Sequence, residues 1–203
     1  MNKKTILAIW PHPDDIELWC FWSMCKYVNE WNDVHFLVLS KWEGGTDKWN
    51  RLAEAKTSSG LINCMLHVED LPDRYISEWQ ETISIIEKYI NEIKPDIVFI
   101  PSWNDTHQDH RAVYRASIVA TRLINEIYIY QAPSTTTDFK PTVYFDISNY
   151  IDKKIEAVRI HTTQWWKVYM AERAVKWLAE YRAFDIFRND KYMEAFEVFR
   201  LVK

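Results

Sequence analysis

Apolar residues along the chain fall into two patterns, short continuous runs and longer stretches with a helical period. The short runs are rich in β-branched and aromatic residues, which is typical of strands buried on both faces of a sheet. We therefore expect seven strands, at Thr5–Trp10, Val34–Leu39, Met65–Val68, Asp96–Pro101, Ile127–Tyr130, Val143–Ile147 and Phe196–Val202.

The stretches between these runs predict helices. The 3.6-residue period is clearest over Ile76–Ile93, and we expect further helices at Ile16–Glu30, Trp49–Ser59 and Arg111–Asn125, with mostly helical chain from Tyr150 to Arg182. Strands that alternate with helices through short connections favour an α/β fold, with a doubly wound, mostly parallel sheet and helices on both faces. No linker divides the sequence, so we expect one domain over residues 1–203.

Composition narrows the classes of function. The chain has 25 Lys and Arg against 29 Asp and Glu without a basic stripe, so we expect no nucleic-acid partner. The apolar run after Met1–Thr5 is too short for a signal peptide or a membrane span. The three cysteines, Cys20, Cys25 and Cys64, lack CxxC spacing, which favours a reducing cytoplasm and argues against a cysteine-bound zinc. The almost wholly apolar Leu18–Cys25 segment leaves a homo-oligomer open.

Polar residues with metal-binding side chains follow the first expected strand. His12, Asp14 and Asp15 lie on the turn into the next helix, at the sheet edge where ligands of open α/β sheets usually bind. One aspartate there could simply cap the helix. Two adjacent aspartates beside a histidine, between Pro11 and Pro13, are more than a cap requires.

A second such loop follows the strand at Asp96–Pro101. It contains Asp105, His107, Asp109 and His110, and again it leads into a helix. Loops after neighbouring strands face each other across the sheet edge, which would bring His12, Asp15 and His110 to one ion. Two imidazoles and one carboxylate, with positions left for water, are typical of a catalytic zinc site.

These two loops resemble a known family. The segments HPDDIE (His12–Glu17) and HQDH (His107–His110) are similar to those of the PIG-L/LmbE-type N-acetylglucosaminyl deacetylases, which are zinc amidases with a Rossmann-like fold. The resemblance extends over most of the chain. It includes RLAE (Arg51–Glu54), PTVYFDIS (Pro141–Ser148) and HTTQ (His161–Gln164).

The resemblance implies a role for each matching residue. His12, Asp15 and His110 would bind zinc or another divalent transition metal, and Asp14 would be the general base. His107 would stabilise the oxyanion or act as the acid, with Asp109 orienting it. The substrate would be a small molecule, an N-acetylglucosamine-type amino sugar or its conjugate.

Substrate contacts are expected from four further residues. The guanidinium of Arg51 could hold a phosphate or carboxylate, or it could pair with Glu54 on its own helix. Trp42 and Trp103 could stack on a sugar or base, and Lys41 lies beside Trp42. We interpret His35 and His67 as structural and Cys20 and Cys25 as core, while His161 matches a family position near the edge of the pocket.

The sequence also departs from the family. Leu18–Trp22 reads LWCFW where the family has a glycine-rich helix start, so the local packing differs or the tryptophans narrow the pocket. Three alternatives to a sugar deacetylase follow. They are a metal-dependent amidase for a non-sugar amide, a metal-binding member without turnover, and a metallo-β-lactamase-like hydrolase suggested by THQDH (Thr106–His110) but lacking a histidine at Asp105.

Overall fold

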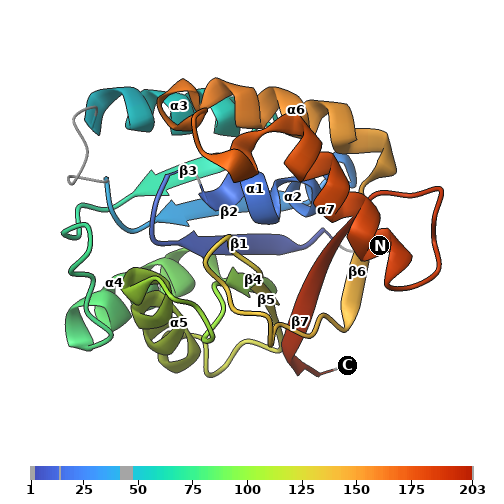
Figure 1. Cartoon of the computed structure of the whole chain (residues 1–203). Helices are drawn as coiled ribbons and strands as arrows, with labels where there is room; N and C mark the ends of the chain where they lie inside the picture. The colour runs from blue at the N-terminus through green and yellow to red at the C-terminus, as the bar shows by residue number, and fades with distance from the viewer. Residues whose placement is uncertain (1–2, 14, 42–47, 203) are drawn as a thin grey trace.

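Seven strands form a single sheet in the computed structural model of the chain, which describes residues 3–13, 15–41 and 48–202 (Figure 1). The order is β3-β2-β1-β4-β5-β7-β6. The five strands from β3 to β5 pair in parallel, and β7 is antiparallel to both of its neighbours. The bounds are β1 Thr5–Trp10, β2 Asp33–Val38, β3 Met65–Val68, β4 Ile97–Ile100, β5 Glu126–Tyr130, β6 Val143–Asp146 and β7 Met193–Leu201. The expected doubly wound, mostly parallel sheet is confirmed.

Helices cover both faces of this sheet. Figure 1 shows α4 and α5 on one side and α1, α2, α3 and α6 on the other. Their bounds are α1 Asp15–Trp19, α2 Phe21–Asn29, α3 Lys48–Gly60, α4 Gln80–Ile93, α5 Gln108–Ala120, α6 Ile151–Ile160 and α7 Glu172–Phe184, with 3-10 turns at Ser148–Tyr150, Thr162–Gln164 and Val168–Met170.

Two apolar cores lie on opposite faces of the sheet, which explains the continuous apolar runs in the sequence. In β1, Ile6, Ala8 and Trp10 pack into the core beneath α1 and α2, whereas Leu7 and Ile9 pack into the core beneath α4 and α5. A strand with helices on both sides has no solvent face, so it shows no polar alternation.

The sequence predicts a single helix at Ile16–Glu30. This prediction is wrong, because the helix is interrupted at Cys20, between α1 and α2. The backbone N–H groups of Trp22 and Ser23 at the start of α2 donate to the carboxylate of Glu194 in β7, over 3.4 and 2.9 Å. Lys154 lies 2.7 Å from the same carboxylate. A carboxylate from a distant strand therefore caps α2 and stabilises the positive end of its dipole.

Several other boundaries differ from the expected ones. Helix α5 begins at Gln108 rather than Arg111 and ends at Ala120 rather than Asn125. Helix α4 begins at Gln80 rather than Ile76, after an extended N-cap residue, Trp79, and the N–H of Ile76 donates to Asp109 over 3.3 Å. The last strand begins at Met193 and lies between β5 and β6.

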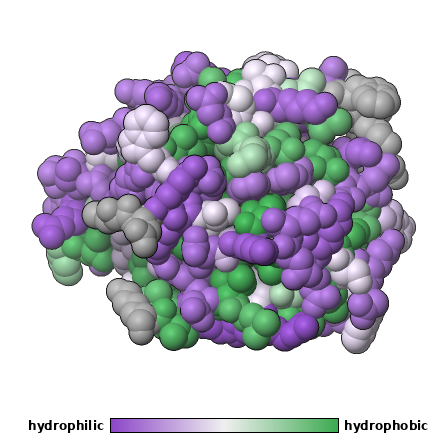
Figure 2. Space-filling model, turned by 180° about the vertical axis from the view of Figure 1, so that it is seen from behind, coloured by the Kyte–Doolittle hydropathy of each residue, from purple (hydrophilic) through white to green (hydrophobic). Residues whose placement is uncertain are grey.

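On the side seen in Figure 2, hydrophilic residues cover most of the surface and apolar residues lie between them in separate patches. Within the described part of the chain, every helix is too short or too polar to cross a membrane.

Candidate active site

The candidate site lies where the strand order reverses. Strand β1 has β2 on one side and β4 on the other, so the loops after β1 and β4 diverge from neighbouring positions at the carboxyl edge. Such a switch point is the usual ligand site of an open α/β sheet. His12 follows β1, Asp15 begins α1, His107 caps α5, and Asp109 and His110 lie in the first turn of α5.

The three residues expected to bind metal do come together. Asp15 Oδ2 lies 3.3 Å from His12 Nδ1 and 3.4 Å from His110 Nε2, and all three residues are buried. Among the described residues, this oxygen accepts no hydrogen bond. Metal–ligand bonds of about 2.1 Å in a tetrahedral zinc site place neighbouring ligand atoms about 3.4 Å apart. The two contacts of Asp15 Oδ2, with His12 Nδ1 and with His110 Nε2, are of that length.

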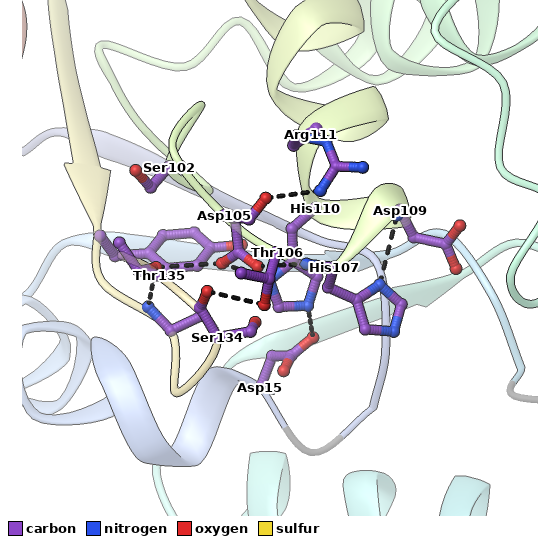
Figure 3. Close-up of polar contacts among 12 residues, drawn as sticks. Asp15, Ser102, Asp105, Thr106, His107, Asp109, His110, Arg111, Ser134 and Thr135 are labelled. Atoms are coloured by element: carbon purple, nitrogen blue, oxygen red, sulfur yellow. Dashed lines mark hydrogen bonds and ion pairs between the residues drawn. The ribbon is translucent and has the colours of Figure 1, made fainter. Parts of the chain in front are cut away.

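Carboxylates hold the other nitrogen of each of these imidazoles. His110 Nδ1 lies 3.1 Å from Asp105 Oδ2, and Figure 3 shows His110 between Asp105 and Asp15. His12 Nε2 lies 3.0 Å from Asp109 Oδ2 and 3.3 Å from Asp73 Oδ1. Metal-binding histidines commonly have such carboxylate partners, which fix the ring and raise its basicity.

A metal between His12, Asp73 and Asp109 is the competing arrangement, since their ligand atoms also lie within 4.8 Å of one another. The Asp109 oxygens there already accept backbone N–H groups, from Arg74 over 2.8 Å and from Ile76 over 3.3 Å. With these hydrogen bonds and its contact with His12, the Asp109 carboxylate orients the imidazole of His12. The Nδ1 side of His12 faces Asp15 Oδ2, which has no such hydrogen bonds among the described residues.

The electrostatics of the site favour protonated imidazoles at His12 and His110 and an ionised carboxylate at Asp15. Burial opposes a charge on His12, but contacts with Asp109, Asp15 and Asp73 outweigh it and raise its pKa to about 10. His110 is likewise buried, and Asp15 and Asp105 raise its pKa to about 9. Despite burial, the two imidazoles hold the pKa of Asp15 well below its usual range. Without metal the site is a network of charge pairs, and metal binding must displace protons from it.

His107 lies beside the other two imidazoles. One ligand nitrogen from each of His12, His107 and His110 falls within 4.8 Å of the others. The backbone N–H of Asp109 donates to His107 Nδ1 over 3.2 Å, which leaves the ring proton on Nε2. Burial lowers the pKa of His107, and the nearby His12 and His110 lower it further. A neutral His107 can therefore present an N–H donor.

The expected partnership between the Asp109 carboxylate and His107 is not what the structure shows. The Asp109 side chain is fully buried and contacts His12, and only its backbone contacts His107 (Figure 3). The reason is helical geometry. His107 caps the N-terminus of α5, so its ring accepts the N–H two residues later, while the Asp109 side chain points toward the segment at Asp73–Ile76.

Sequence reasoning missed two carboxylates of the site, Asp73 and Asp105. Asp73 lies on the loop after β3, two strands away from β1, and its side chain is 1% exposed. Asp105 lies in the second loop, where the hydroxyl of Thr135 also donates to it over 3.0 Å. The sequence signal that could have identified both aspartates is their position after predicted strands, since the carboxyl ends of these strands lie at the same edge of the sheet.

Three motif segments away from the metal ligands form a buried polar cluster behind α1. Glu17 Oε1 lies 3.1 Å from His161 Nε2 and accepts a hydrogen bond from Ser58. Glu54 accepts the backbone N–H and the hydroxyl of Thr163 over 2.9 and 2.7 Å. His161 therefore ties α1 and α3 to the segment after α6, away from the expected pocket edge.

The residues expected to contact substrate are dispersed. The Lys41 ammonium pairs with Asp70 over 3.0 Å. Arg51 lies near the start of α3 and is 2% exposed. A ligand arriving from solvent would therefore not reach its guanidinium directly. Trp103 follows β4 and is 56% exposed. Asp14 and Trp42 lie outside the described residues.

Relatives of known name share this architecture. A curated relative from Escherichia coli strain K12, the uncharacterized deacetylase YaiS, is 33% identical over 169 residues, which cover 79% of this chain and 91% of the relative. The diacetylchitobiose deacetylase of Thermococcus kodakarensis is 26% identical over 202 residues, covering 83% of this chain and 76% of the relative.

Among solved structures, the N,N'-diacetylchitobiose deacetylase from Pyrococcus horikoshii matches with a TM-score of 0.84 at 22% identity, over 98% of this chain and 84% of that chain. The family described as PIG-L, GlcNAc-PI de-N-acetylase, matches residues 7–121, the part of the chain that contains both ligand loops. With a matched family profile across more than half of its length and a relative above 30% identity, this chain belongs to the PIG-L family.

Proposed function

We propose that this chain is a metal-dependent deacetylase that hydrolyses the N-acetyl group of an N-acetylglucosamine-type amino sugar or its conjugate, with Zn²⁺ as its metal. The observation that supports this most directly is the position of Asp15 Oδ2 between His12 Nδ1 and His110 Nε2. Each imidazole is held from behind by a carboxylate. Three protein ligands with room for a further one are typical of catalytic rather than structural zinc.

The proposed roles divide the polar residues into ligands and proton carriers. His12, Asp15 and His110 hold the metal, which when bound would polarise the amide carbonyl and lower the pKa of water. Asp14 takes the proton of the attacking water. His107 donates a hydrogen bond from Nε2 to the oxyanion, in keeping with the acceptor role of its Nδ1, and Asp14 passes the proton it took from water to the leaving amine.

The sugar specificity rests on the relatives, two of which are named for diacetylchitobiose. Trp103 offers an exposed ring at the same sheet edge, which suits stacking on a sugar face. Lys41 would reach a substrate only by leaving Asp70, and Arg51 only if the groups that bury it move aside. We therefore rank Trp103 above Trp42, Lys41 and Arg51 as a substrate contact.

Acetate release by the zinc-loaded protein tests the proposal. The panel contains N-acetylglucosamine, diacetylchitobiose, a nucleotide-linked N-acetylglucosamine and an N-acetyl amino acid. We expect chelator-sensitive release from a sugar substrate. We also expect Asp14→Asn to lose at least about 100-fold in kcat while it still binds Zn²⁺, since general-base catalysis contributes about that much.

The same experiment separates the alternatives. Release from the N-acetyl amino acid alone would replace the sugar deacetylase by a non-sugar amidase. Zinc binding without release from any compound would favour a metal-binding member without turnover. Equal activity of wild type and Asp14→Asn would contradict the role proposed for that carboxylate.

A further inference from the structure

A cavity of about 430 Å³ lies between α1, the segment after β5, α7 and β7, and none of the proposed metal ligands lines it. Its wall is mainly apolar and includes Leu18, Trp19, Val175, Leu178 and Met193. This volume lies within the usual range of pockets that bind small molecules. Trp19, one of the bulky residues at the family's glycine positions, therefore lines a cavity, whereas Trp22 is core.

Two walls of this cavity belong to elements that also contribute to the metal centre. Trp19 follows Asp15 by four residues on α1, so the two side chains lie on the same face, one helical turn apart. On the opposite wall, Ala132 belongs to the loop whose Thr135 hydroxyl donates to Asp105, the carboxylate behind His110. A group bound in the cavity would therefore extend from the amide at the metal.

The charged side chains that line the cavity are already paired with protein groups. Lys154 and Glu194 lie 2.7 Å apart and are 5% and 4% exposed. Arg182 donates to Asp185 over 3.0 Å and to Gln131 over 2.5 Å. A phosphate or carboxylate entering the cavity would have to break one of these pairs, whereas an uncharged apolar group would leave them intact.

We infer that this cavity binds an uncharged apolar group of the substrate, an alkyl chain or aromatic ring attached to the amino sugar beside the scissile amide. This inference rests on the proposed function and specifies the substrate class. The group could be the glycosidic substituent or a longer N-acyl chain. Both sources share the same chemistry, and substrates of each kind distinguish them.

Two homologous series provide the test. One contains β-glycosides of N-acetylglucosamine with methyl to octyl substituents, and the other contains N-acylglucosamines from acetyl to octanoyl. Burial of a methylene is worth about 0.8 kcal/mol, or roughly a fourfold change in kcat/KM. We expect kcat/KM to rise by about that factor per methylene in one series until the cavity is full. A flat response in both series, with turnover of the shortest member, would overturn the inference and leave the proposed function intact.

A pair of variants on α7 connects the effect to the cavity. Ala174 lines the cavity and is half-buried, so Ala174→Phe fills it, and Ala174→Leu does so less severely if the larger ring prevents folding. Arg173→Phe adds the same ring at the adjacent, exposed position, outside the cavity lining. We expect the ratio of kcat/KM between octyl and methyl substrates to fall at least tenfold in Ala174→Phe and to stay unchanged in Arg173→Phe. Equal ratios in all three proteins would contradict the assignment.

A binding measurement keeps the test independent of turnover. Octyl glucoside has the apolar chain without an amide, and calorimetric titration measures its affinity for the full chain below the concentration at which it forms micelles. We expect binding by wild type and by Arg173→Phe, and at least tenfold weaker binding by Ala174→Phe. If no N-acyl sugar is hydrolysed, this binding still supports the cavity assignment, and its absence from wild type overturns it.

Discussion

The carboxylate of Asp109 contacts His12 on the side away from the proposed metal. Replacing it in Asp109→Asn keeps the shape of the side chain and removes the charge that fixes His12. We expect Zn²⁺ affinity to fall about 10- to 100-fold, as is usual for partners of metal-binding histidines. Competition with a chromophoric chelator measures this. Asp190→Asn, at an exposed position, should leave the affinity unchanged, and an unchanged affinity in Asp109→Asn would refute the positioning role.

His35 and His67 form a pair on β2 and β3, outside the metal site. His35 Nδ1 lies 3.0 Å from His67 Nε2, and the rings are stacked with centroids 5.3 Å apart. Burial lowers the pKa of both residues; His67 lowers that of His35 further, and for His67 burial outweighs the opposing effect of Glu92. The charged side chains near the pair are Asp33, Glu69, Lys88 and Glu92.

This pair should make stability depend on pH. A histidine with a depressed pKa binds protons more readily when unfolded, so its contribution is complete above about pH 6.5 and is lost as the pH falls below that value. We expect His67→Gln to show a smaller loss of unfolding free energy between pH 7.5 and pH 5 than wild type. Urea denaturation at both pH values measures the difference. An equal loss in both proteins would exclude the pair as its source.

The sequence predicts the residues that carry distinctive chemistry better than those that support them. His12, Asp15 and His110 stand on two loops at strand ends, and the rules of parallel sheets place such loops together. Asp73 belongs to a loop that contains no histidine, and its contact with His12 depends on how the backbone of Arg74 and Ile76 meets Asp109 at the start of α5. That path depends on the left-handed backbone of Arg74, at a φ of 67°, which no periodicity encodes.

At the scale of elements, the contribution of Glu194, which caps α2, can be tested by replacing two adjacent lysines, only one of which pairs with it. Lys154 is buried against Glu194, whereas Lys153 is exposed. Lys154→Met leaves a buried carboxylate without its cation, and we expect it to lower the free energy of unfolding by about 3–5 kcal/mol. Lys153→Met should change it by no more than about 0.5 kcal/mol. Denaturant titration of both variants measures the difference, and similar values would contradict the importance of the pair.

Element type is predicted well by local pattern, and element ends are predicted less well. The two apolar cores require a continuous apolar run in β1, which has the expected bounds, and the edge strand β3 also has the expected bounds. The break at Cys20 has no local signal, because every residue from Leu18 to Trp22 is compatible with a helix. It is stabilised by Glu194, more than 170 residues away in the chain, and such long-range contacts override local preference.

At the scale of the whole molecule, metal binding should stabilise the fold. A ligand that binds only the native state adds about 4 kcal/mol when its free concentration is about 1,000 times Kd. We expect Zn²⁺ to raise the Tm of wild type by several degrees and a chelator to reverse the shift. His110→Ala removes one of the three ligands and should abolish the shift. A zinc-dependent Tm shift of equal size in His110→Ala would place the stabilising ion elsewhere.

The position of β7 has a consequence for folding during synthesis. Strand β6 pairs with the described part of the chain only through β7, and β7 also covers the outer edge of β5 and supplies the cap of α2. A nascent chain that has emerged only as far as residue 190 therefore presents an open sheet edge, an unpaired strand and a helix without its cap. Because open edges are templates for aggregation, this interval is where we expect a chaperone to hold the polypeptide as it leaves the ribosome.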